Sequence, residues 1–277
     1  MSFNVRYGTA ADGENAWPLR REMVAGVLGE FQPDVVGIQE ALLFQLEELS
    51  ALLPEMSWVG VGRDDGVTEG EFAAILYRSD RLEVVGEGTF WFSDTPEVPG
   101  SMTWGNEIPR ICTWGRFRDR ASGAVFTLFN LHWDHRSQIS RERGAQLLLD
   151  RIRNRGNPQD RVLVTGDFNA GEENPAFRAL LEAEDPSLKD SFRVRFPEAR
   201  GVGTFHGFNG GSEGEKIDAV LVGNGWEVLD AEIDRTSFKG RYPSDHNPVT
   251  AVLRWGSEGV LLPETGRPKD GDGPGVH

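Results

Sequence analysis

The sequence predicts an α/β fold built on mixed β-sheets, and three observations support this. Short runs of β-branched and aromatic residues alternate with stretches whose apolar residues recur at helical spacing. Some predicted strands follow one another directly, whereas others are separated by a helix, so we do not expect a purely parallel sheet. The chain has 277 residues, 38% of them hydrophobic and 26% charged, which suits one large α/β domain or two small ones.

The predicted elements of the first part of the chain follow from these patterns. The opening stretch SFNVRYG is typical of a strand. Residues 18–31 predict a helix, because their apolar residues fall on one face and Pro18 suits a first turn. A second helix is predicted at 44–53, and strands at 34–40, 57–62, 72–78 and 81–92. The segment 93–109 is irregular and contains Pro, Gly and Trp, which indicates an ordered, functional surface loop.

The second part begins with a hairpin at 111–132 that turns at 121–123. Helices are predicted at 140–153 and 174–183, and strands at 161–167, 216–223 and 248–255. From Gly256 onward the chain is rich in Gly and Pro. We therefore expect one domain over residues 1–255 and a flexible tail over 256–277.

The net charge of the chain limits the kinds of partner that it can bind tightly. With 29 basic and 44 acidic side chains the net charge is −15, which disfavours tight nonspecific binding to a nucleic-acid backbone. The arginines do cluster, in two groups near Arg110 and Arg141, and we expect one or two of them to contact phosphate. No apolar stretch approaches membrane-spanning length, and the single cysteine excludes an internal disulfide. A strand at the first residue indicates that the natural start is missing, so the compartment is left open.

Polar side chains occur at the end of one apolar strand after another. Each one alone has an ordinary explanation as a turn former, a helix cap or a buried polar group. For Asp167 with Asn169, a helix cap and a functional site are equally supported. Six such strand ends together favour a site. They carry Asn4, Glu40, Asn130 with His132, Asp167 with Asn169, Asp218, and Asp245 with His246. Converging carboxylates repel one another unless a cation lies among them, and oxygen ligands without a cysteine cluster favour Mg²⁺ or Mn²⁺.

The motifs SFNVR, GIQE, NLHWDH, GDFN, KIDAV and SDH occur in the order and spacing of the endonuclease/exonuclease/phosphatase superfamily. The sequence resembles this superfamily over residues 1–255, and the phrases GENAWP, GVGRDDG and GTFHGF resemble a bacterial branch of it. The resemblance implies a DNase I-like catalytic domain, a four-layer α/β/β/α sandwich of two packed mixed sheets flanked by helices.

The resemblance also implies roles for residues. Glu40 resembles the principal metal ligand, with Asn4 beside it and Asp245 as a second carboxylate. Asp167 and Asn169 resemble the pair that orients the attacking water and the phosphoryl group, and we favour Asp167 as the base.

His246 resembles the imidazole that contacts the scissile phosphate, with Asp218 holding its tautomer, and His132 resembles a further phosphate contact. We expect Arg110, Arg141 and Asn130 to contact the substrate. For the two arginines, a surface ion pair is an equally supported alternative.

The predicted function is metal-dependent hydrolysis of a phosphodiester or phosphomonoester by a monomer. A small molecule or an exposed headgroup is the favoured substrate, and a DNA or RNA nuclease is the alternative. A catalytically inactive binding module is disfavoured, because Glu40, Asp167 and His246 are all present. Five tryptophans are candidates to line the pocket, although most buried tryptophans belong to cores: Trp17, Trp91, Trp104, Trp114 and Trp133.

Overall fold

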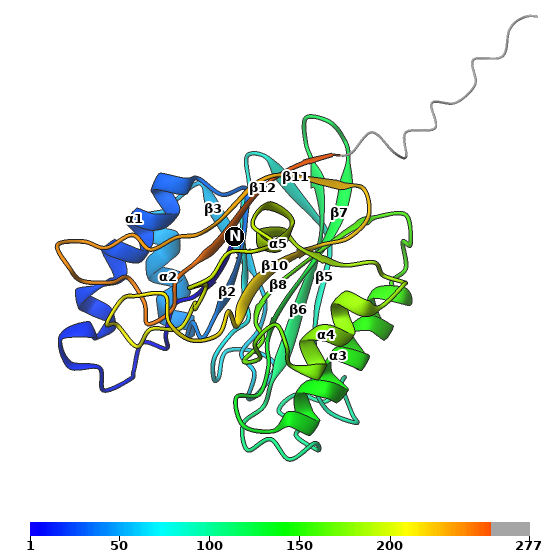
Figure 1. The fold of residues 1–277 in the computed structure, drawn as a ribbon, viewed down its shortest axis with the longest axis horizontal. Helices are drawn as coiled ribbons and strands as arrows, with labels where there is room; N and C mark the ends of the chain where they lie inside the picture. Colours follow the sequence, from blue (N-terminus) through cyan, green and yellow to red (C-terminus); the bar gives the residue numbers. More distant parts are fainter. Residues whose placement is uncertain (256–277) are drawn as a thin grey trace, which may run out of the picture.

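The computed structural model describes residues 1–255, in which two six-stranded β-sheets pack against each other between outer helices (Figure 1). Helices α1 (Arg21–Phe31) and α2 (Leu43–Leu52) cover one sheet. Helices α3 (Gln138–Arg153) and α4 (Pro175–Glu182) cover the other. The predicted four-layer α/β/β/α fold is confirmed. The predicted tail, 256–277, lies outside the described residues.

The first sheet has the strand order β11-β12-β1-β2-β4-β3. Strands β1 and β2 are parallel, and the other pairs are antiparallel, so the sheet is mixed as predicted. Its strands are β1 (Ser2–Asn4), β2 (Val35–Gln39), β3 (Met56–Val59), β4 (Ile75–Arg78), β11 (Trp226–Ile233) and β12 (Val249–Trp255).

The second sheet has the order β5-β6-β7-β8-β10-β9, and only β7 and β8 are parallel within it. The crossover between these two strands contains α3, as a parallel connection requires. The strands are β5 (Leu82–Trp91), β6 (Ile111–Asp119), β7 (Val125–His132), β8 (Arg161–Asp167), β9 (Lys189–Asp190) and β10 (Asp218–Val222); the short helix α5 (Ser191–Arg195) follows β9.

Polar hydrogen bonds join the two sheets at the centre of the sandwich. Asn130 donates to the carbonyls of Ile38 and Ala74, at 2.8 and 2.9 Å, and its Oδ1 accepts from Gln39 and Thr165, at 2.6 and 3.0 Å. These four bonds use its full capacity. The expectation that Asn130 contacts the substrate is therefore corrected: this side chain holds the sheets together.

Gly37 allows this close approach of the sheets. A Cβ atom at this position would lie 2.1 Å from Thr165 Oγ1 and 2.3 Å from Asn130 Oδ1, which no side chain tolerates. The glycine in the middle of β2 thus has a packing reason.

Element boundaries depart from the prediction in places. The helix predicted at 18–31 begins at Arg21, because Pro18 lies in a preceding 3₁₀ turn, Trp17–Leu19. The strand predicted at 72–78 is regular only from Ile75. Strand β11 was missed, and its alternating exposed and buried residues fit the edge strand that it forms. Among the described helices, none is long and apolar enough to cross a membrane.

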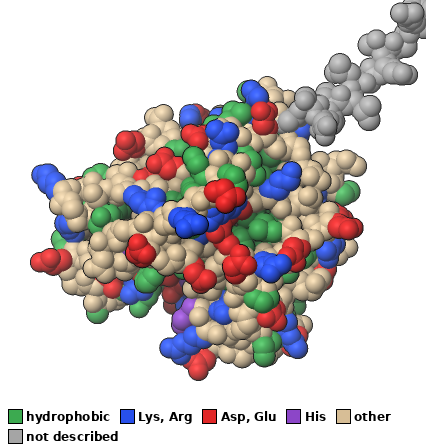
Figure 2. All heavy atoms as spheres, viewed as in Figure 1, with side chains coloured by type: hydrophobic (Ala, Val, Ile, Leu, Met, Phe, Trp, Pro, Cys, Tyr) green, Lys and Arg blue, Asp and Glu red, His purple; other side chains and the backbone are tan. Residues whose placement is uncertain are grey.

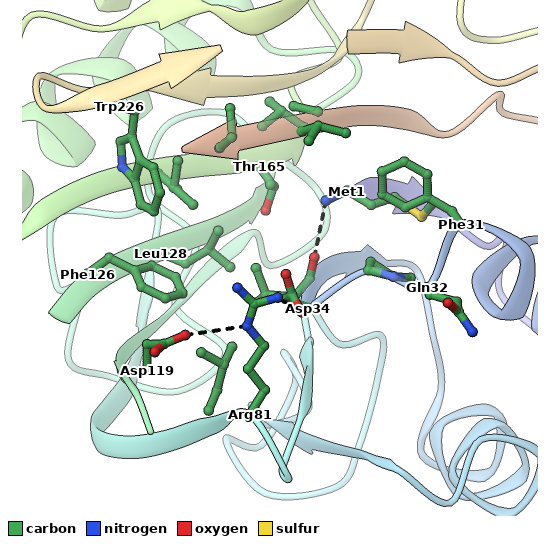
Figure 3. Close-up of a pocket in the computed structure, with 18 of the residues that line it drawn as sticks. Met1, Phe31, Gln32, Asp34, Arg81, Asp119, Phe126, Leu128, Thr165 and Trp226 are labelled. Carbon is green, nitrogen blue, oxygen red and sulfur yellow. Dashed lines mark hydrogen bonds and ion pairs between the residues drawn. The ribbon is translucent and has the colours of Figure 1, made fainter. Parts of the chain in front are cut away.

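A cavity of about 320 Å³ lies between the sheets near the start of β1, and Figure 3 shows its lining. Phe126, Leu128 and Trp226 contribute apolar surface, and Arg81 forms an ion pair with Asp34 at 2.7 Å. None of the polar strand-end residues identified in the sequence analysis lines this cavity. This cavity is therefore separate from the candidate site.

Candidate active site

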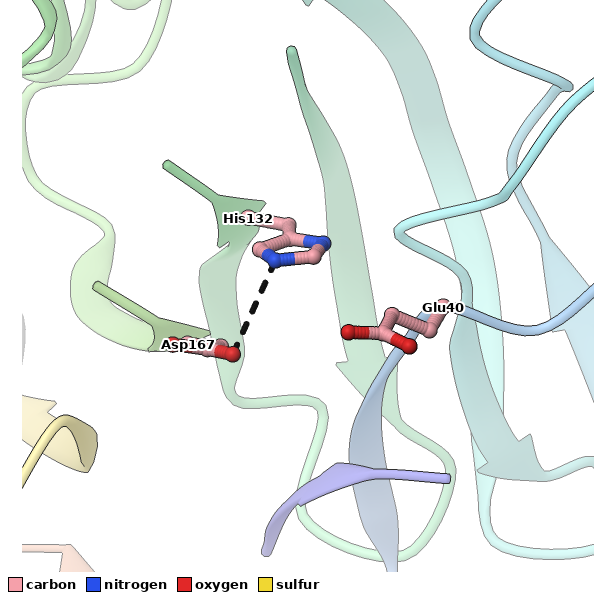
Figure 4. A group of neighbouring side chains, drawn as sticks. All are labelled: Glu40, His132 and Asp167. Carbon is pink, nitrogen blue, oxygen red and sulfur yellow. Dashed lines mark ion pairs between the residues drawn. The ribbon is translucent and has the colours of Figure 1, made fainter. Parts of the chain in front are cut away.

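Strand register places Asp167 between two other polar side chains. It pairs with His132 across the parallel strands β7 and β8, and with Asp218 across the antiparallel strands β8 and β10. Directly paired residues point to the same face of a sheet. The three side chains therefore stand side by side, with His132 Nε2 at 3.6 Å from Asp167 Oδ2 (Figure 4).

The first sheet supplies Asn4 and Glu40 from the opposite side. Asn4 ends β1, and its Nδ2 donates to Glu40 Oε1 at 3.0 Å and to Asp167 Oδ2 at 2.9 Å. One amide thus ties together carboxylates from both sheets. Figure 4 shows Glu40 facing the pair formed by His132 and Asp167.

His246 and Asp218 form the expected pair. His246 Nδ1 lies 2.8 Å from Asp218 Oδ2, both side chains are buried, and His246 Nε2 lies 3.8 Å from Asp167 Oδ2. Burial disfavours the imidazolium, but the carboxylates of Asp218 and Asp167 outweigh it and raise the pKa of His246 well above its ordinary value.

His132 has the opposite electrostatic environment. Arg110 Nη1 lies 3.0 Å from His132 Nε2 and 3.2 Å from Nδ1, and Arg110 Nη2 lies 2.8 Å from His135 Nδ1. Burial, together with the charges of Arg110 and Arg63, lowers the pKa of His132 well below its ordinary value. The imidazole of His132 is therefore neutral near pH 7.

The two arginines predicted to contact substrate differ. Arg110 is buried against Asp134, at 3.4 Å, and lines the cleft. Arg141 does not line the cleft. It donates to the carbonyl of Asp134 at 2.7 Å and to Gln138 Oε1 at 2.7 Å. The expectation for Arg141 is corrected: it supports the loop that carries Asp134.

Backbone conformation also marks this region. Arg6, Glu40 and Asn169 have positive φ angles of 58°, 65° and 46°, and all three line the cleft. Non-glycine residues in this conformation are uncommon and concentrate at functional sites. For Asn169, the side chain donates to the carbonyl of Trp133 at 3.0 Å, and its backbone N–H donates to Asp167 Oδ1 at 2.9 Å.

Comparisons with known proteins agree with this geometry. A sequence model described as the endonuclease/exonuclease/phosphatase family matches residues 1–246. The chain belongs to this family. Its members are hydrolases that act on phosphoesters, so the family and fold predicted from the motifs are confirmed.

Two solved structures of Bacteroides proteins illustrate the similarity. An endonuclease/exonuclease/phosphatase protein of Bacteroides vulgatus is 35% identical, with a TM-score of 0.83, and the match covers 92% of this chain and 97% of that one. A mannosyl-6-phosphatase of Bacteroides thetaiotaomicron is 32% identical, also with a TM-score of 0.83, over 92% and 98% of the two chains. An uncharacterised protein of Acanthamoeba polyphaga mimivirus is 29% identical over 86% of this chain and 92% of its own length.

Enzymes of the endonuclease/exonuclease/phosphatase family generally use a divalent metal ion, and the donor set of this member fits one. Ligand atoms of Glu40, His132 and Asp167 lie within 4.8 Å of one another. Burial and the charge of Asp218 raise the pKa of Asp167 to about 7, because they outweigh the opposing charge of His246. Burial also raises the pKa of Asp245, which lines the same cleft. A hard cation bound in the cleft would favour the charged form of both carboxylates and so lower both pKa values.

The cleft of this family member has a volume of about 340 Å³ and includes residues that the sequence alone did not single out. They are Arg6, Tyr7, Arg63, Glu71, Ile108, His135, Phe205 and Ile217. His135 and Phe205 lie within motifs that carried the resemblance, NLHWDH and GTFHGF, which was a usable signal. Arg6, Arg63 and Ile217 also lie within such motifs, SFNVR, GVGRDDG and KIDAV, whereas Glu71 lies in none of them.

None of the five candidate tryptophans lines the cleft. Trp104, in the segment 93–109, is packed in the core beneath α3 and donates to Asp94 Oδ1 at 2.8 Å. Trp17, Trp91 and Trp133 are buried as well. The expectation that tryptophans form the pocket is corrected, because their large apolar surface is used in packing.

Proposed function

We propose that this protein is a divalent-metal-dependent phosphoesterase that hydrolyses a small phosphomonoester, with a sugar phosphate as the favoured substrate. The observation that carries the proposal is the arrangement around Asp167. Its carboxylate is tied to Glu40 through Asn4 and lies opposite an imidazolium that Asp218 holds. Phosphoester hydrolysis needs a positioned water, a proton acceptor and donors to the phosphoryl oxygens, and this arrangement provides them.

Each group has a role in this proposal. Glu40 and Asp245, with Asn4 beside Glu40, would hold the metal ion, which when bound would supply positive charge to the phosphoryl oxygens. Asp218 engages His246 Nδ1, so the Nε2–H of His246 is available to donate to a phosphoryl oxygen. Asp167 accepts the proton of the attacking water while Asn169 helps to orient it. Arg110 donates to the phosphoryl group from the other side, next to neutral His132, whose Nε2 accepts from Arg110 Nη1.

Size and charge favour a small substrate. A cleft of about 340 Å³ is at the small end of ligand pockets. Many surface arginines are paired with carboxylates, as Arg118 is with Glu83 and Arg136 with Glu107, which leaves less positive charge for a phosphate backbone. On the face shown in Figure 2, acidic and basic side chains are interspersed. Similarity to a mannosyl-6-phosphatase adds support for a sugar phosphate.

The test is a metal-dependent substrate screen. Protein dialysed against EDTA is assayed with Mg²⁺, with Mn²⁺ or with chelator, on mannose 6-phosphate, glucose 6-phosphate, phenyl phosphate, bis(p-nitrophenyl) phosphate, single- and double-stranded DNA, and RNA. We expect metal-dependent release of phosphate from the monoesters. Activity confined to nucleic acids or to the diester would overturn the substrate class, and full activity in chelator would overturn metal dependence. Asp167→Asn, purified in parallel, controls for a contaminating phosphatase.

A further inference from the structure

The roles proposed above leave one ion pair in the cleft unused. Both terminal nitrogens of Arg63 donate to the carboxylate of Glu71, at 2.6 and 2.9 Å. The side chains keep 11% and 14% of their surface accessible, and both line the cleft. A pair that is this closely joined and yet reaches the cleft can present acceptor and donor atoms to a bound molecule.

The backbone around this pair is held firmly. The N–H of Arg63 donates to the carbonyl of Glu71 at 3.1 Å, and Trp91 Nε1 donates to the carbonyl of Arg63 at 2.6 Å. The intervening loop is closed by Asp65, whose Oδ1 accepts three backbone N–H groups. The guanidinium and the carboxylate are therefore pre-positioned, which reduces the entropy lost when they bind a ligand.

The pair also lies at a suitable distance from the reacting centre. Glu71 Oε2 is 3.8 Å from His132 Nδ1, and on the other side of that ring Nε2 is 3.6 Å from Asp167 Oδ2. One imidazole ring thus separates Glu71 from Asp167. A group attached to a phosphate bound at Asp167 falls within reach of the pair.

A different kind of surface lies beside His246. Phe205 is 51% exposed, lines the cleft, and its ring centroid is 5.1 Å from that of His246. The cleft therefore combines a charged hydrogen-bonding wall, which favours hydroxyl groups, with an exposed aromatic ring, which favours an apolar face. A sugar ring offers both.

We propose that Arg63 and Glu71 form a binding site for hydroxyl groups of the alcohol portion of the substrate, with Phe205 against the apolar face of its ring. The site selects polyhydroxylated phosphomonoesters over simple aryl or alkyl ones. This inference rests on the proposed phosphomonoesterase function and specifies the substrate class of the same cleft.

The kinetic test compares a sugar phosphate with an ester that lacks hydroxyl groups. The ratio of kcat/KM for mannose 6-phosphate to kcat/KM for phenyl phosphate is measured for the wild type and for Glu71→Gln. We expect this ratio to fall about tenfold or more, mainly through KM for the sugar phosphate. The matched control is Glu172→Gln, which removes a carboxylate from another closely joined pair, with Arg193, outside the cleft; its ratio stays at the wild-type value.

A second variant and a binding measurement complete the test. Phe205→Ala alters an exposed side chain, so the fold persists, and the same ratio is expected to fall severalfold. Binding of free mannose is followed by saturation-transfer NMR in EDTA, where no turnover is involved, and is expected to be lost in Glu71→Gln but not in Glu172→Gln.

An unchanged ratio in both cleft variants, or a wild type that does not bind mannose, would overturn the inference. If the wild type binds mannose through Glu71 yet hydrolyses neither ester, the subsite stands and the proposed function fails.

Discussion

At the scale of single residues, neighbouring charge decides what each histidine does. His132 and His246 are both buried, and each has its Nε2 within 4 Å of Asp167 Oδ2. Their pKa values nevertheless shift in opposite directions, because His246 is bonded to Asp218 and His132 contacts Arg110. One imidazole is therefore a cation near pH 7, whereas the other is neutral and accepts a hydrogen bond from Arg110.

The pairing of His246 with Asp218 predicts a specific mutational pattern. His246→Ala should lower kcat about 10²-fold or more, the scale of losing a donor to the transition state. Asp218→Asn should cost less, because the donor remains while its orientation and charge support are lost. The double variant should be about as slow as His246→Ala alone, since the two residues act as one unit.

The measurement is kcat on a phosphomonoester, together with thermal unfolding of each variant. Additive losses in the double variant would contradict the pairing. So would lower stability accompanied by near-normal turnover per folded molecule, which indicates a structural role for both residues.

At the scale of elements, a buried arginine joins segments that are far apart in the sequence. Arg20, immediately before α1, donates to the carbonyls of Asn15, Val5, Arg6 and Pro243 at 2.6 to 2.9 Å. Two of these carbonyls follow Asn4 in the chain, and Pro243 precedes the SDH motif. Burial lowers the pKa of Arg20 to about 10, so it stays charged at neutral pH. It thereby connects the end of β1 to the segment that carries Asp245 and His246.

Replacement of Arg20 should lower the stability of the folded protein. Arg20→Met leaves buried carbonyl groups without a donor, and we expect it to lower the free energy of unfolding by about 3 kcal/mol or more. The neighbouring Arg21→Met is the matched control, because Arg21 only pairs with Glu48 on the surface, and its effect should be within about 0.5 kcal/mol. Urea denaturation measures both. Equal stability of the two variants would show that the buried hydrogen bonds of Arg20 contribute little.

At the scale of the whole molecule, packing of the two sheets brings negatively charged side chains close together. Each sheet contributes a carboxylate to the cleft, Glu40 from the first and Asp167 from the second, and Asn4 bridges them. Sheet packing therefore brings like charges together. A bound cation would stabilise the folded state more than the unfolded chain, where the ligands are far apart.

This coupling predicts that metal stabilises the fold through Glu40. Addition of Mg²⁺ or Mn²⁺ to EDTA-treated protein should raise Tm, by an amount equivalent to about 2.7 kcal/mol when the ion is at 100 times its Kd. Glu40→Gln should remove most of this rise and, in chelator, should be at least as stable as the wild type, because it relieves repulsion from Asp167. Differential scanning fluorimetry with and without metal tests this. A metal-induced rise in Glu40→Gln equal to that of the wild type would rule out Glu40 as a ligand.

The sequence by itself determined much of this protein. Hydrophobic periodicity placed most strands and helices, because period 2 and period 3.6 are local properties of the chain. Polar residues at successive strand ends located the site, since the ends of neighbouring strands meet at one edge of a sheet. The ordered motifs then indicated the family and, with it, the packing of two sheets.

Only the tertiary structure decided how individual side chains are used. Asn130 and His132 share one side of β7, yet three partners from the opposite sheet and Thr165 of β8 saturate Asn130, whereas His132 reaches the cleft. Arg110 enters the cleft whereas Arg141 supports a loop, and Arg63 with Glu71 forms an unforeseen wall. Strand periodicity fixes the side to which a residue points, but its partners come from segments distant in sequence, and those partners determine whether its hydrogen bonds and charge remain available to a ligand.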